Sequence, residues 1–142
     1  MEQHPIYGST PDFEAEIHIL SKEESGRIRT PLNGIRWDFR YPEDDLSAGL
    51  HMIWPFFLSE DGTQAPMLEP LSGMRLAQMF IISRERVYYH KRRLFVGYEL
   101  HCHEASMKVA VGRVTVLIGL AKFLYIETSL YKQNSNLSNG CS

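Results

Sequence analysis

The segment 84–93 combines residue types that proteins use to bind nucleic acids or other proteins. It holds five basic residues, one acidic residue and two tyrosines. Basic side chains neutralise phosphates and aromatic rings stack on unpaired bases, so the mixture is typical of surfaces that bind single-stranded or looped RNA. Tyrosine and arginine are also common anchors of protein interfaces. The predicted partner-binding residues of this segment are Arg84, Arg86, Tyr88, Tyr89, Lys91, Arg92 and Arg93.

Four further arginines would extend this patch if the fold placed them on the same face, namely Arg27, Arg29, Arg36 and Arg40. We include Arg27 and Arg29 among the predicted partner-binding residues. The simpler interpretation of the 84–93 segment is a solvated hairpin whose tyrosines pack on the rest of the domain. The pattern of residue types leaves both interpretations open.

A second pattern, His101-Cys102-His103, suggests metal chemistry. The period of a strand places both imidazoles on one face, and Glu99 falls on that face as well. Two histidines at this spacing can hold Zn²⁺ or Cu²⁺, but a site needs a third or fourth ligand. The alternative is a polar outer strand face with Cys102 in the core. We adopt this alternative and expect no metal and no other cofactor.

The chain carries none of the local patterns that indicate catalysis. It has no G-x-x-x-x-G-K-[ST] loop to hold nucleotide phosphates, no G-x-S-x-G elbow and no H-E-x-x-H helix. Glu14 and Glu16 share one face of a predicted strand, but two carboxylates on an open surface do not make an acid–base pair. We therefore predict a protein that is not an enzyme and binds no nucleotide.

Composition indicates an ordinary globular chain. The 142 residues are 44% hydrophobic and 23% charged, with a net charge of −2, so no global attraction to nucleic acid or to anionic membranes is expected. Cys102 and Cys141 are too few for a disulfide framework, which favours a reducing compartment. No apolar run is long enough to span a bilayer, and the first residues lack the apolar centre of a signal peptide. A cytoplasmic protein without membrane contact is expected.

The elements that must position these residues are strands, because apolar and polar residues alternate with a period of two along most of the chain. Six strands are predicted, at 13–19, 35–41, 50–58, 76–82, 94–103 and 109–120, with a long loop at 59–73. Pro55 suggests an edge or a bulge in the third strand. In the last strand, positions 110, 112, 114, 116 and 118 share one face, and Gly112 marks a bulge or a close backbone approach.

Six strands without a long helix predict an all-β fold, either a closed barrel or a sandwich. The predicted organisation is a flexible N-terminus at 1–11, one β-barrel domain at 12–120, a short helix or extra strand at 121–132, and a disordered tail at 133–142. The tail is assigned as disordered because it is rich in asparagine and serine.

Two stretches of the chain resemble one known domain. Residues 13–27 are similar to the opening of the third domain of elongation factor Tu, where a strand F-E-A-E-x-x-x-L-x-K-E-E precedes a G-G-R-H loop and a threonine–proline pair, here Thr30-Pro31. Residues 109–117 resemble the closing strand of that domain, V-G-A-G-V-V-T-K-I, and residues 67–74 are more distantly similar to its M-V-M-P-G-D element. The resemblance spans about residues 11–120 and implies a six-stranded antiparallel β-barrel.

The resemblance also suggests a role. The third domain of elongation factor Tu contacts tRNA, partner proteins and its own GTPase domain, and Arg27 matches the arginine of its G-G-R-H loop. Met107 stands where the family has a second arginine, so one basic contact is retained and the other is lost. We therefore expect a stand-alone, non-catalytic binding module whose partner is a protein linked to translation factors or to effectors that target them. Binding of tRNA or another structured RNA, through Arg27 and the 84–93 segment, is the alternative.

Overall fold

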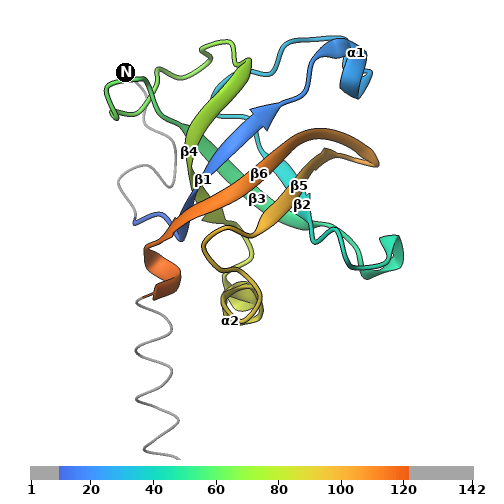
Figure 1. Cartoon of the computed structure of the whole chain (residues 1–142), viewed down its shortest axis with the longest axis vertical. Coiled ribbons are helices and arrows are strands. Elements are labelled where there is room, and N and C mark those ends of the chain that lie inside the picture. Colours follow the sequence, from blue (N-terminus) through green and yellow to red (C-terminus); the bar gives the residue numbers. More distant parts are fainter. Residues whose placement is uncertain (1–9, 122–142) are drawn as a thin grey trace, which may run out of the picture.

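The computed structural model describes residues 10–121, which form a closed barrel of six antiparallel strands in the order β1-β4-β3-β2-β5-β6 (Figure 1). This confirms the predicted fold. The strands are β1 Phe13–Ile19, β2 Trp37–Arg40, β3 His51–Phe57, β4 Gly73–Ile81, β5 Glu99–Glu104 and β6 Met107–Leu117. The predictions for the first residues, for most of the 121–132 segment and for the 133–142 tail concern residues outside the described part of the chain.

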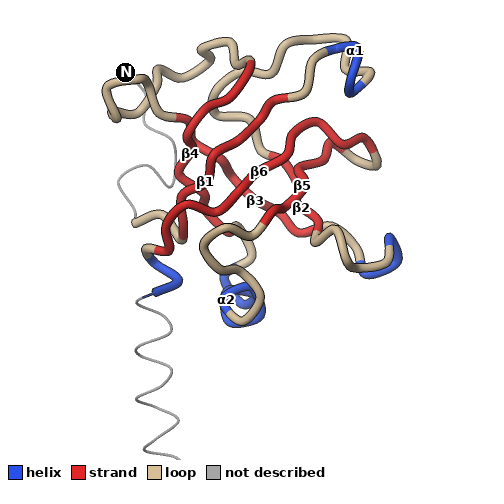
Figure 2. Tube along the Cα trace, in the orientation of Figure 1, coloured by secondary structure: helices blue, strands red, loops and turns tan. Residues whose placement is uncertain are grey.

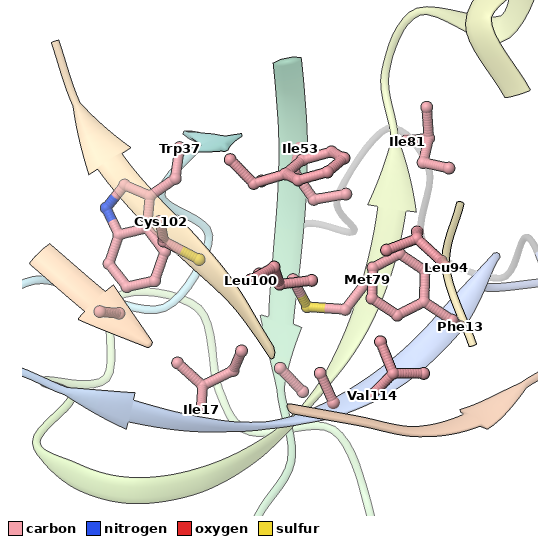
Figure 3. Close-up of a cluster of buried hydrophobic side chains, with 14 of the residues drawn as sticks. Phe13, Ile17, Trp37, Ile53, Met79, Ile81, Leu94, Leu100, Cys102 and Val114 are labelled. Atoms are coloured by element: carbon pink, nitrogen blue, oxygen red, sulfur yellow. The ribbon is translucent and has the colours of Figure 1, made fainter. Parts of the chain in front are cut away.

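The barrel interior follows directly from the alternation in the sequence. The apolar positions of β1, namely Phe13, Ala15, Ile17 and Ile19, are buried, while Glu14, Glu16 and His18 point outward. Figure 3 shows how side chains from strands that are distant in sequence meet in this core, with Ile17, Leu100 and Met79 converging from different strands. Burial of such side chains is the main stabilising contribution, at about 25 cal/mol per Å² of apolar surface.

A register shift between β6 and β1 corrects the predicted strand phase. The pairing with β1 passes from Glu14↔Val116 to Ala15↔Val114, so that Thr115 is an extra residue. The expected inward series therefore holds for Ala110, Gly112 and Val114 but fails at Val116, which is exposed. A bulge of this kind moves every later side chain to the opposite face of the strand. This bulge lies at Thr115 and not at Gly112. The groups that pack closely on Gly112 are the side chains of Ile17 and Leu100, so the expected close approach there is of side chains and not of backbone.

Pro55 is accommodated at a place where β3 pairs on one side only. β3 pairs with β4 from Ile53 to Phe57, but its pairing with β2 ends at Ile53. Because proline cannot donate a backbone hydrogen bond, it fits where the ladder is one-sided. The edge predicted at Pro55 is therefore confined to the end of β3, where this strand pairs with β4 but no longer with β2.

Helical segments account for the remaining departures from the prediction (Figure 2). The expected polar loop after β1 contains helix α1, Lys22–Ser25, which begins at a capping box between Ser21 and Glu24. The simpler interpretation of 84–93 as a hairpin is wrong, because this segment forms the 3₁₀ turn η2, Arg84–Arg86, and helix α2, Val87–Lys91. A second 3₁₀ turn, η1, spans Leu46–Ala48. The start of the fifth predicted strand, 94–98, is a turn leading into β5.

Candidate binding surface

The predicted partner-binding residues lie at two opposite ends of the barrel. The segment with α2 connects the end of β4 to the start of β5, whereas Arg27 contacts Glu104 at the end of β5. Figure 1 shows α1, which Arg27 follows, at the upper end of the molecule and α2 at the lower end. The fold therefore does not combine Arg27 and Arg29 with the 84–93 segment into one patch.

Arg27 is held against the barrel by its own contacts. Its Nε donates a hydrogen bond of 2.7 Å to Glu104 Oε2, and one of its Nη groups donates to the carbonyl of Arg29. Trp37 Nε1 donates to the same Glu104 oxygen at 3.0 Å, so a buried core residue shares the acceptor. These contacts give Arg27 a structural role between α1 and the β5–β6 turn. Arg29, by contrast, is exposed.

Two of the five basic residues of the 84–93 segment are also held by carboxylates. Arg84 Nη1 lies 2.8 Å from Oδ2 of Asp12, which is buried and also accepts the backbone N–H of Ile81. Arg93 donates to both carboxylate oxygens of Asp44 at 2.7 Å, and to Glu43 at 3.1 Å. A bidentate arginine–carboxylate pair is directional and stronger than a neutral hydrogen bond. Both arginines thus anchor the segment to the barrel.

The pKa values around Arg93 are shifted in the directions that these contacts require. The hydrogen bond from Arg93 lowers the pKa of Asp44, and the hydrogen bond from the Tyr98 hydroxyl lowers the pKa of Glu43. The guanidinium carbon of Arg93 also lies 3.8 Å from the centre of the Tyr41 ring, and its Nη1 donates to the Tyr89 hydroxyl at 2.6 Å. Tyr89 is therefore part of the support of α2 and not an outward anchor.

An aromatic and imidazole cluster lies beneath α2. The Tyr41 hydroxyl and His90 Nδ1 are 2.7 Å apart and share a hydrogen bond, while the rings of His51 and His90 meet edge to face with centres 4.7 Å apart. Burial lowers the pKa of His90 to about 3, and burial also lowers the pKa of His51. Both imidazoles are therefore neutral at physiological pH, which suits their packing against aromatic rings.

The outward side of this end combines basic and apolar side chains. Arg86 lies over the Tyr89 ring at 4.4 Å, and both Lys91 and Arg92 lie 5.5 Å from the centre of the Tyr88 ring. Tyr88 is 42% exposed, and the following Phe95 and Val96 are 58% and 60% exposed. We define the α2 surface as Arg86, Tyr88, Lys91, Arg92, Phe95 and Val96.

The alternation pattern did not identify Phe95 and Val96 as exposed residues of a binding surface. They were expected in a strand, because Leu94–Tyr98 contains apolar residues, but they lie in the turn between α2 and β5. The signal that distinguishes them is Gly97, whose φ of +94° breaks the extended backbone immediately before β5.

The two histidines of β5 have different surroundings. His101 Nε2 faces Glu99 Oε2 at 3.5 Å, as the shared strand face predicts. His103 is buried, and neither of its ring nitrogens has a hydrogen-bond partner in the described part of the chain. Among residues 10–121, no group of three or more histidine, cysteine or acidic side chains is arranged to hold a metal ion.

Comparisons with known proteins add no family. No protein-family profile matches the chain, and no curated protein is significantly similar to it. Within residues 10–121, none of the helices combines the length and apolar character that crossing a bilayer requires.

Proposed function

We propose that this barrel is a non-catalytic protein-binding module and that its partner docks on the α2 surface. The observation that supports this proposal is the distribution of the basic side chains around Tyr88. Arg84 and Arg93 pair with carboxylates at the base of the segment, whereas Arg86 lies over the Tyr89 ring and Arg92 lies over the exposed Tyr88 ring. Aromatic residues and arginine are enriched in the energetic centres of protein interfaces.

RNA is the weaker candidate because the basic residues lie at two ends of the barrel and several of them pair with carboxylates. Binding to phosphates needs several cations along one path, since each neutralised phosphate contributes through counterion release. Arg27 lies at the other end of the barrel and is paired with Glu104, and Arg84 and Arg93 are paired as well. The net charge of −2 adds no general attraction. The chemistry of the α2 surface instead fits an acidic partner that carries apolar side chains.

The resemblance of residues 13–27 and 109–117 to the third domain of elongation factor Tu directs the choice of partners to test. Proteins that contact translation factors, and effectors that target such factors, are the first candidates. This choice rests on similarity of two strands, which mainly maintain the barrel, so it is a proposal about where to search.

The test is affinity capture with the full chain, performed with and without nuclease. We expect the captured protein to remain after nuclease treatment and to be lost from a variant carrying Tyr88→Ala and Phe95→Ala. Leu76→Ala is the matched control, because Leu76 is an exposed apolar residue on β4, away from the α2 surface. Capture that disappears with nuclease would contradict the proposal.

A salt titration distinguishes the two partner classes directly. For a protein partner held mainly by apolar contacts with Tyr88 and Phe95, affinity should fall only modestly between low and physiological salt, because few exposed ion pairs are screened. For RNA, tRNA should bind with an affinity that falls steeply as salt rises, and the joint change Lys91→Ala and Arg92→Ala should reduce that slope. Measurable tRNA binding at physiological salt with such a slope would replace our proposal by the RNA alternative.

A further inference from the structure

A second exposed apolar region lies at the end of the barrel opposite α2. Two loops meet there, the 27–35 segment before β2 and the 66–71 segment before β4. Asn33 joins them and is completely buried. Its side-chain amide donates to the carbonyls of Ala65 and Pro66, at 3.0 and 3.2 Å, and its side-chain oxygen accepts the Phe57 N–H at 3.0 Å.

Backbone contacts make this pair of loops a rigid frame. Asn33 N donates to Glu69 O at 2.8 Å, and Leu68 N donates to Asn33 O at 2.9 Å. Gly34 packs so closely on Met67 that an added Cβ would lie 2.8 Å from Met67 Cε. Since the loops are fixed by these contacts, side chains that they display to solvent lose little freedom when a partner binds.

Leu68, which these loops expose to solvent, has a strained backbone conformation. Leu68 has φ of +67°, in the left-handed region that a leucine adopts only at an energetic cost. Its side chain is 66% exposed, so burial does not compensate for this strain. Ile28 is 84% exposed and Leu32 is also exposed. This φ belongs to a β-turn closed by the Glu69 N–H, which donates to the Pro66 carbonyl at 3.2 Å. Glycine adopts such a φ without strain, so the turn itself gives no reason for an exposed leucine at this position.

Leu68 borders a groove of about 350 Å³ that is mainly apolar and is shared by both loops. Its charged lining residues are Arg27 and Arg29, with no carboxylate among the described side chains that line it. Glu104 neutralises Arg27. Arg29 has no carboxylate partner among residues 10–121, so within this part of the chain it supplies the uncompensated positive charge at the rim. The volume is at the small end of ligand pockets, which suits one or two side chains of a peptide.

We propose that this Leu68 groove is a second docking site, and that its occupant is a segment of another protein in which an apolar side chain lies beside acidic residues. The apolar side chain packs on Leu68 and Leu32, and a carboxylate pairs with Arg29. The site is separate from the α2 surface, so the barrel can hold two different partners at its two ends. This inference does not depend on the function proposed for α2.

The decisive variant is Leu68→Gly. Glycine adopts positive φ without strain, so this change should leave the melting temperature unchanged or raise it while removing the apolar contact. Ala105→Gly is the matched control, since Ala105 is the other non-glycine residue with positive φ (53°) in the described part of the chain and does not line the groove. A marked fall in melting temperature for Leu68→Gly would show a structural role and overturn the proposal.

The binding test uses a displayed library of random short peptides, selected on the immobilised full chain. We expect enriched peptides that combine Leu, Ile or Phe with Asp or Glu. Synthetic copies should bind Leu68→Gly about tenfold more weakly or worse, because burial of a leucine side chain contributes at least that factor. They should also bind Arg29→Glu more weakly, and they should bind Ala105→Gly like the unmodified protein.

Three further results would overturn this proposal. The first is a selection that yields no peptide or yields basic peptides, and the second is equal affinity for Leu68→Gly and the unmodified chain. The third is self-association in sedimentation velocity that Leu68→Gly abolishes, which would make a second copy of the chain the occupant. The variant Tyr88→Ala with Phe95→Ala should retain peptide binding, so failure at the α2 surface and failure at the Leu68 groove are distinguishable.

Discussion

Arg92 and Arg93 are neighbours in the chain whose guanidinium groups have different surroundings. Arg93 donates to both oxygens of Asp44, and its guanidinium lies over the Tyr41 ring. Arg92 lies beside Tyr88 on the outward side of α2. The two residues are chemically identical, so their different roles depend only on what the fold places around them.

This difference predicts that two alanine substitutions have unequal effects on stability. Arg93→Ala should lower the free energy of unfolding by about 2 kcal/mol, because Asp44 and the Tyr89 hydroxyl lose a charge-assisted partner. Arg92→Ala should change it by less than about 0.5 kcal/mol, as is usual for surface substitutions. Urea denaturation of both variants measures this. Equal stability of the two variants would show that the Arg93 cluster contributes nothing to folding.

Gly112 provides a second prediction at the residue scale. A Cβ at this position would lie 2.8 Å from Ile17 Cδ1 and 3.2 Å from Leu100 Cδ1, both inside the barrel. Gly112→Val should therefore destabilise the protein by about 1–3 kcal/mol, the usual range for overpacking a core. Thermal unfolding tests it, with Val111→Ala on the outward side of β6 as the control. A variant that melts like the unmodified protein would show that Ile17 and Leu100 yield easily.

At the scale of elements, α2 is attached to the barrel over neutral imidazoles. His90 contacts Tyr41 and His51, and it is among the most deeply buried side chains of the described chain. Protonation would place a charge among aromatic rings and next to Arg93 and Arg86, which already disfavour it. We therefore expect the attachment of this element to weaken when His90 is protonated.

Acid should weaken the fold before carboxylates titrate. The folded pKa of His90 is about 3, below its ordinary value of 6.5, so between these two pH values the unfolded chain binds a proton that the folded chain does not. Its contribution is present in full above about pH 6.5 and is lost as pH falls, at up to about 1.4 kcal/mol per pH unit. The lowered pKa of His51 acts in the same direction.

The measurement is the free energy of unfolding between about pH 8 and pH 5 for the unmodified protein and for His90→Gln. The variant should be less stable at pH 8, where both imidazoles are neutral, but should lose less stability on acidification. A pH dependence in His90→Gln as steep as that of the unmodified protein would assign the acid sensitivity to other groups.

At the scale of the whole molecule, the barrel is not closed equally well on all sides. β1 pairs along its whole length, Phe13–Ile19, with both β4 and β6. β2 pairs with β3 only from Trp37 to Phe39, and with β5 only from Asp38 to Arg40. The seam around β2 is therefore the shortest in the described sheet, which favours local opening there.

Hydrogen exchange should report this asymmetry. The amide protons of β2 should exchange by local opening at a lower free energy than those of β1, whose exchange should require global unfolding. Mass spectrometry of the exchanged protein under native conditions measures both strands in one experiment. Slower exchange in β2 than in β1 would show that the loops around Asn33 close this side more firmly than the sheet itself does.

The sequence by itself determined the strands and most of the core. A strand that is half buried needs apolar residues at every second position, and this local rule identified Phe13–Ile19 correctly and the other strands to within a few residues. It also identified Gly112 as a tightly packed position. It could not find the α2 helix, because a helix of five residues shows too little periodicity to distinguish it from a turn.

Only the tertiary structure decided which residues share a surface. Arg27 pairs with Glu104 and Asp12 with Arg84, each across more than 70 positions in sequence. The strained backbone of Leu68 likewise depends on Asn33, which lies in another loop. Such pairings follow from strand order and register, which arise from the packing of the whole barrel. Periodicity therefore determines which face of a strand is buried, while strand order and register determine which exposed residues come together.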